Sequence, residues 1–142
     1  MHVLGDAAVI VLLAVAVVHV YWAVGGKAGI DAAIPTDPSA GGNGRKALSP
    51  GALMTALVAG ALVAAAGLVA ARIGLFALPL PAWLIQAGCA VLALTFLARA
   101  IGEFRYVGFF KRVRGTRFAR MDAVLYSPLC LLLAIAIGMN CL

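Results

Sequence analysis

Long apolar runs alternate with shorter polar segments along the chain. A helix needs roughly 20 consecutive apolar residues to cross a hydrocarbon core about 30 Å thick. Four runs reach that length, at residues 6–25, 51–75, 82–101 and 121–142. Apolar and polar residues do not alternate within these runs, so the strands of a membrane β-barrel are excluded. The pattern predicts an all-α, polytopic membrane protein in which residues 1–142 form a single domain, a bundle of four transmembrane helices.

The composition agrees with this prediction. Hydrophobic residues occupy 65% of the 142 positions and charged residues 11%, whereas soluble domains carry about 25% charged residues. The first apolar run lacks a basic flank and is longer than a signal peptide needs, so we expect it to remain as a helix.

Basic residues lie almost entirely on one side of the predicted membrane. Four spanning helices place residues 26–50 and 102–120 on the same side, and these segments together with Arg99 carry ten of the eleven Lys and Arg residues. Loops rich in Lys and Arg remain in the cytoplasm. We therefore predict a multi-pass protein of the cell (inner or plasma) membrane, with both loops cytoplasmic and both termini outside (N-out/C-out).

The net charge of +6 is explained by this topology and by contact with the anionic head groups of the lipid bilayer. We predict no nucleic-acid partner, because no fold able to read bases accompanies the basic run at residues 111–117. The three cysteines lack the spacing of metal ligands, and we predict neither a metal site nor a cofactor. Ala56, Gly60 and Ala64 form a stripe of small residues that favours close helix packing, within the bundle or in a homo-oligomer through residues 51–75.

Polar and aromatic side chains gather near the predicted cytoplasmic ends of the helices. Spacings of three, four and seven residues place them on common helical faces, if the third helix continues beyond residue 101. Ionisable residues inside a membrane are costly and usually functional. We predict that six of these side chains converge in one cavity open to the cytoplasmic leaflet: His19, Trp22, Arg99, Glu103, Asp122 and Tyr126. The other members of the set are Tyr21, Asp31, Arg105 and Tyr106.

An apolar cavity with carboxylic acids and aromatic rings suits chemistry on a lipid-soluble substrate. A carboxyl group in a low dielectric can remain protonated and act as a general acid, and aromatic rings stabilise passing cations. These features favour protonation of a prenyl or terpenoid substrate, followed by cyclisation or isomerisation of the carbocation. The catalytic candidates are Glu103, Asp122 and His19, with Asp31 as a third choice of acid.

The other members of the set are predicted to bind the hydrophobic substrate. They are Tyr21, Trp22, Asp31, Arg99, Arg105, Tyr106 and Tyr126. A structural interpretation is also open, in which the aromatic residues form an interfacial belt and Glu103 pairs with Arg99 one helical turn away.

Two alternative functions remain open. The first is a non-catalytic accessory protein that binds a lipid or a protein through the basic segment at residues 102–120. The second is a subunit of a transporter or channel. The sequence shows no inverted repeat and the polar residues stop short of the outer half of the helices, which argues against transport.

Two stretches carry a resemblance to known proteins. They are "HVYWAVGGKAGIDAAIPT" at residues 19–36 and "RAIGEFRYVGFFKRVRGTRFARMDAVLYSPLCLLLA" at residues 99–134. With them the chain resembles a family of small bacterial four-helix membrane proteins that has largely lacked a function. In size, topology and chemistry it is also similar to the small actinobacterial integral-membrane terpene cyclases. That similarity implies metal-independent cyclisation of a prenyl tail, and the chain has no DDxxD motif of the metal-dependent cyclases.

Overall fold

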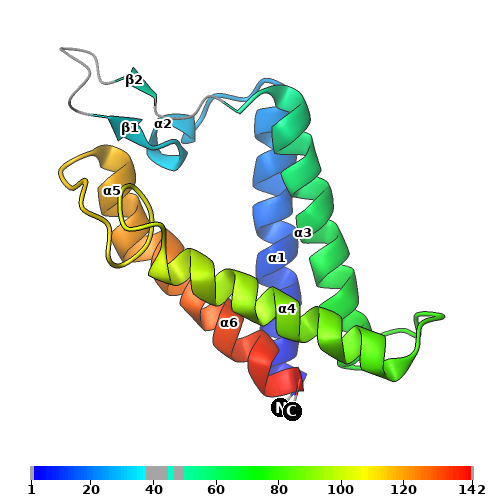
Figure 1. Ribbon diagram of the computed structural model, residues 1–142. Coiled ribbons are helices and arrows are strands. Elements are labelled where there is room, and N and C mark those ends of the chain that lie inside the picture. Colours follow the sequence, from blue (N-terminus) through cyan, green and yellow to red (C-terminus); the bar gives the residue numbers. More distant parts are fainter. Residues whose placement is uncertain (1, 38–44, 47–49, 142) are drawn as a thin grey trace.

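The computed structural model describes residues 2–37, 45–46 and 50–141 (Figure 1). The elements are α1 (His2–Ala23), α2 (Ile30–Ala33), β1 (Thr36–Asp37), β2 (Arg45–Lys46), α3 (Ala52–Arg72), α4 (Ala82–Ile101), α5 (Arg117–Met121), the π-helical turn η1 (Asp122–Tyr126) and α6 (Ser127–Cys141). The short strands β1 and β2 form one antiparallel pair. Helices α5, η1 and α6 follow one another without a break.

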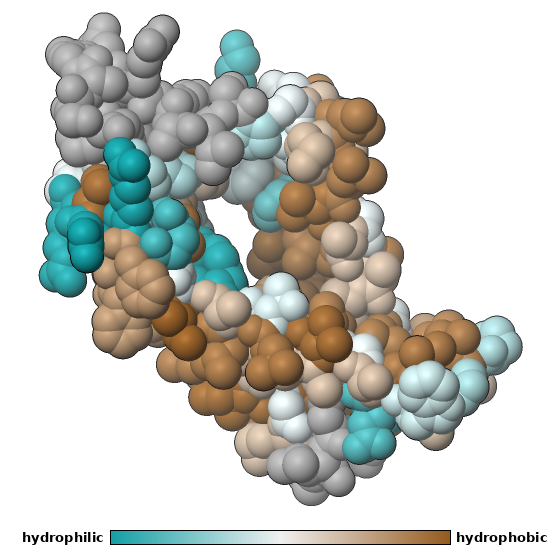
Figure 2. Space-filling view, viewed as in Figure 1, coloured by the Kyte–Doolittle hydropathy of each residue, from teal (hydrophilic) through white to brown (hydrophobic). Residues whose placement is uncertain are grey.

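The predicted all-α fold with four spanning helices is confirmed. Four stretches of the described residues are long and apolar enough to cross a membrane: Val3–Ala23, Ala52–Arg72, Ala82–Ile101 and Arg117–Asn140. Apolar side chains also cover the outside of the helices (Figure 2), and Leu53 and Val124 are 74% and 75% exposed. Because water disfavours such continuous apolar surface, the chain is a multi-pass membrane protein whose helices face lipid.

Glycines explain why two helices end earlier than the apolar runs predict. At the end of α1, the N–H of Gly25 donates to the carbonyl of Trp22 at 3.1 Å, and that of Gly26 donates to Tyr21 at 2.9 Å. Gly25 has a φ of +99°, the left-handed conformation that this helix-ending motif requires at the residue before its last one. The same pair of bonds ends α3 at Arg72.

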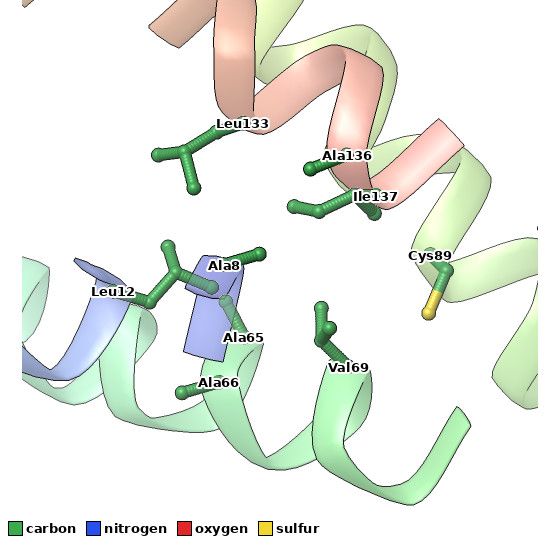
Figure 3. Packing of buried hydrophobic residues seen from close by; sticks show 9 residues of the cluster. All are labelled: Ala8, Leu12, Ala65, Ala66, Val69, Cys89, Leu133, Ala136 and Ile137. Carbon is green, nitrogen blue, oxygen red and sulfur yellow. The ribbon is translucent and has the colours of Figure 1, made fainter. Parts of the chain in front are cut away.

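The helices form two antiparallel pairs. Helix α1 packs along α3 and α4 packs along α6, with smaller contacts between the pairs. The pairs meet at the end that holds both termini and diverge toward the other end (Figure 1). The apolar core occupies the end where they meet (Figure 3), and it consists of Ala8, Leu12, Ala65, Ala66, Val69, Cys89, Leu133, Ala136 and Ile137. Its many alanines allow the backbones to approach closely.

The opposite end is built from the two long connections. Helix α2 contacts α5, and the hydroxyl of Tyr126 donates to the carbonyl of Ala32 at 3.3 Å. Ala32 and Ile34 are buried on one side of this contact, and Phe118 is buried on the other. The first connection therefore reaches from the α1–α3 pair to the fourth spanning helix.

The π-helical turn η1 lies directly before Pro128. In this turn the N–H of Ser127 donates to the carbonyl of Asp122, five residues earlier. Proline has no N–H, and in a regular α-helix its ring would press on the carbonyl four residues before it, that of Val124. The wider π turn moves that carbonyl away. The helix therefore accommodates Pro128 through a π turn rather than through a simple kink.

Two glycines fold the connection after α4 into a tight turn. Gly102 has a φ of +86° and Gly108 a φ of +90°. A Cβ on Gly102 would meet the carbonyl oxygen of Val107, and a Cβ on Gly108 would meet that of Ile101. The two backbone segments therefore cross in direct contact. The expectation that Arg99, Glu103 and Tyr106 share a helical face is wrong, because α4 ends at Ile101.

Replacement of either glycine by alanine is expected to destabilise the protein. Gly108→Ala places a methyl group against backbone and in a disfavoured φ region, at a cost of about 1–3 kcal/mol for the φ alone. Thermal unfolding in detergent micelles measures this loss. The control is Gly60→Ala. A Cβ at position 60 would meet no other atom within 4 Å, and alanine is favoured over glycine in a helix by up to about 1 kcal/mol. Equal unfolding midpoints for Gly108→Ala and Gly60→Ala would contradict the tight crossing.

Candidate functional site

The carboxylate of Asp122, in the π-helical turn η1, is fully buried, with 0% exposure. Its Oδ1 accepts a hydrogen bond from Nη2 of Arg99 at 2.9 Å. Its Oδ2 accepts from the N–H of Gly108 at 2.8 Å, from Nζ of Lys111 at 2.9 Å and from Oγ of Ser127 at 3.1 Å. These five residues are called the Asp122 cluster below. They join α4, the loop at residues 102–116, η1 and α6.

Local structure explains how the cluster forms. Arg99 lies in the last turn of α4. Lys111 is only 5% exposed, and its Nζ also donates to the carbonyl of Gly108 at 3.0 Å, which closes the loop on itself. The π turn brings the side chains of Asp122 and Ser127, five residues apart, to the same face. A buried charge is tolerated only when it is paired and hydrogen-bonded, and this carboxylate meets both conditions.

The cluster is suited to positioning. Both oxygens of Asp122 accept hydrogen bonds from the chain itself and the side chain is buried, so the carboxylate is enclosed by its own donors. Three of the four donors meet at Oδ2 and one meets at Oδ1. The prediction that Asp122 is a catalytic acid stays a prediction, and its contacts favour a role in holding the loop against the helices.

Glu103 lies apart from the cluster, on the surface of the loop. Its Oε1 accepts a hydrogen bond from the N–H of Tyr106 at 2.7 Å and so closes a short turn. The guanidinium carbon of Arg105 lies 4.9 Å from the centre of the Tyr106 ring. Arg99 pairs with Asp122, so the predicted contact between Arg99 and Glu103 on one helix is replaced by a contact between two helices.

His19, Trp22 and Tyr21 form a second group at the end of α1. The rings of His19 and Trp22 meet edge to face with centroids 5.3 Å apart, and Nδ1 of His19 lies 2.8 Å from the carbonyl oxygen of Val15. Nε1 of Trp22 donates to the carbonyl of Ala28 at 2.8 Å, and the N–H of Ala28 donates to the hydroxyl of Tyr21 at 3.3 Å. These aromatic residues therefore fix the chain that follows α1.

The structure thus distributes the predicted set over four places. Arg99 and Asp122 lie together in the cluster, Glu103, Arg105 and Tyr106 lie in the loop, and His19, Tyr21 and Trp22 lie on α1. Tyr126 links the fourth helix to α2, the helix that also carries the exposed Asp31. Sequence reasoning missed Lys111, Ser127 and Gly108 as partners of Asp122. No group of three His, Cys, Asp or Glu side chains among the described residues could hold a metal ion.

Two further features lie at this end of the molecule. Figure 2 shows an opening between the α1–α3 pair and the fourth spanning helix, where the pairs diverge. Nη1 of Arg99 is buried and has no hydrogen-bond partner among the described residues. A buried donor without a partner costs about 1–3 kcal/mol, so this nitrogen is suited to an acceptor that is not part of the described chain.

A model of the protein family DUF3995, described as protein of unknown function, matches residues 12–137. The matched range contains the Asp122 cluster, the loop and the aromatic group of α1. No curated protein and no solved structure matches the chain. The match supports the predicted family of small membrane proteins without a known function, whereas the similarity to terpene cyclases stays a hypothesis.

Asp122→Asn is expected to cost about 3–5 kcal/mol of stability, because it leaves two cations without their common counter-ion. Thermal unfolding in micelles measures the loss. A second change, Lys111→Met, removes one of the two cations and should recover part of the stability. Ser127→Ala is the milder control, since a single neutral hydrogen bond contributes about 1 kcal/mol. An Asp122→Asn protein as stable as the parent would contradict the central role of this carboxylate.

Proposed function

The chain belongs to the family DUF3995, and from that premise we propose that it binds one lipid-soluble molecule of the prenyl or terpenoid class between its two helix pairs. The observation that carries the proposal is the buried Nη1 of Arg99, a donor without a partner among the described residues, at the end where the pairs diverge. A polar group on the ligand accepts this hydrogen bond, and the apolar chain lies between the helices.

The distribution of side chains supports this arrangement. The apolar core cluster lies where the helix pairs meet, toward the end with the termini (Figure 1), so it does not occupy the space between the diverging helices. Half-buried aromatic groups belong to both helix pairs, with His19 and Trp22 on α1 and Tyr126 on η1. Sites for small molecules combine apolar walls with a few polar groups that fix orientation, and this end of the molecule offers both.

Replacement of Arg99 by lysine tests the proposal. Arg99→Lys keeps the positive charge beside Asp122 but removes the second guanidinium nitrogen. We expect a C15 prenyl alcohol that carries a photoreactive diazirine to label residues 16–23 and 126–133 of the parent. Labelling should fall about tenfold in Arg99→Lys, the effect of losing roughly 1.4 kcal/mol.

The matched control is Arg72→Lys, which makes the same replacement at the opposite end. Its labelling should equal that of the parent. Labelling spread evenly over the lipid-facing positions of all four helices, or unchanged in Arg99→Lys, would refute a site between the pairs.

A second candidate is the proton-initiated cyclisation or isomerisation of the bound molecule, with Glu103 as general acid. The observation that favours Glu103 over Asp122 is its exposure, because an exposed carboxyl group can regain its proton from water after each turnover. Under this proposal the loop brings the carboxyl group to the ligand.

Glu103→Gln separates the two candidates. The amide oxygen of glutamine can still accept the N–H of Tyr106, so the turn is expected to persist, while the acidic proton is lost. Turnover of a prenyl substrate should fall about 10²–10⁴-fold, the usual contribution of a general acid, with labelling by the diazirine probe unchanged. The control is Asp6→Asn, which removes a carboxyl group near the start of α1, at the end of the molecule that holds the termini (Figure 1). Parent-like turnover in Glu103→Gln would remove Glu103 as the acid.

A further inference from the structure

A pocket of about 320 Å³ lies between the loop at residues 102–116 and the start of the fourth spanning helix. It does not involve the Nη1 atom of Arg99 or the aromatic group of α1. The residues that line it are Phe109, Lys111, Arg114, Gly115, Ala119, Arg120 and Ala123. It is therefore separate from the site proposed above, and it can be judged independently of that proposal.

The local sequence leaves this space empty. Ala119 and Ala123 are four residues apart on consecutive helical turns, and Gly115 precedes the helix, so small residues form one wall. The hydroxyl of Thr116 accepts the N–H of Ala119 at 3.0 Å and starts α5 at Arg117, four residues before the predicted beginning of the apolar run. This early start is what brings the wall to the level of the basic loop.

The charge around the pocket is strongly positive. Residues 99–122 contain seven Lys and Arg side chains and two acidic ones. Asp122 is shared by two cations, so the cluster behind the pocket keeps an excess of positive charge. Arg114 and Arg120 are exposed at its rim. Guanidinium groups bind phosphate oxygens with paired hydrogen bonds, and a phosphate group therefore fits this rim.

Apolar surface continues from the pocket toward the membrane. Val124 and Leu125 follow Ala123 directly and are exposed, as are Phe109 and Phe110 on the loop. A free phosphate ion would gain nothing from these side chains, whereas the acyl chains of a lipid would cover them. We propose that this pocket binds the phosphate group of an anionic phospholipid, whose acyl chains lie along Val124 and Leu125.

If the positive charge served only to set the membrane topology, the number of basic residues would matter and their exact positions would not. The chain offers a matched pair for this distinction. Arg114→Gln with Arg120→Gln removes two charges at the pocket, and Arg112→Gln with Arg117→Gln removes two exposed charges outside its lining. Ala123→Leu fills the pocket without changing the charge.

The experiment measures binding of phosphatidylglycerol to the detergent-solubilised protein by native mass spectrometry, with phosphatidylcholine and glycerol phosphate as comparison ligands. We expect one saturable phosphatidylglycerol. Its affinity should fall about tenfold or more in the Arg114/Arg120 variant, because both guanidinium groups at the rim that can bond the phosphate oxygens are removed. It should also fall in Ala123→Leu. It should change less than about twofold in the Arg112/Arg117 variant, because neither of these residues lines the pocket.

Three results would overturn the proposal. Equal losses in the two double variants would mean diffuse attraction to anionic lipid. Tight binding of glycerol phosphate would mean a site for a free phosphate ester instead of a lipid. Unchanged affinity in Ala123→Leu would mean that the pocket itself is not occupied.

Discussion

A carboxylate buried inside a membrane-spanning segment must be met by donors on every side, and the structure around Asp122 is organised by that requirement. The donors come from three parts of the chain: Arg99 from α4, Gly108 and Lys111 from the loop, and Ser127 from α6. The dependence is mutual, because the buried ammonium of Lys111 needs the same anion. The end of α4, the loop and the fourth spanning helix are therefore fixed relative to one another by one side chain.

The two ends of the molecule are held by different interactions. Lipid chains are as apolar as leucine, so helices in a membrane associate through close packing and hydrogen bonds instead of the hydrophobic effect. Small residues provide close packing at the end with the termini, and the Asp122 cluster provides hydrogen bonds and ion pairs within the second helix pair. Between the pairs neither kind of contact runs the full length of the helices, and this explains their divergence.

The four helices could be predicted because each depends on the composition of a continuous segment. Arg99 and Asp122 were both recognised as candidates, but their contact joins residues 23 positions apart, and helical spacing gives no information on such pairs. Ser127 was missed because five residues along an α-helix turn a side chain by roughly 140°, and only the π turn removes that offset. Lys111 was assigned to the basic run, since nothing in the sequence distinguishes a buried lysine from an exposed one.

The π turn in η1 has a consequence for how this chain can vary. It accommodates one residue more than an α-helical turn would, so α6 is rotated by roughly 100° relative to an uninterrupted helix. Asp122 is aligned with Arg99 before this rotation, and Leu133 and Ile137 are aligned with the core after it. Deletion of one residue between positions 122 and 126 would preserve only one of these two alignments and turn the other toward lipid. The length of this short segment is therefore under a stricter constraint than the identity of most of its residues.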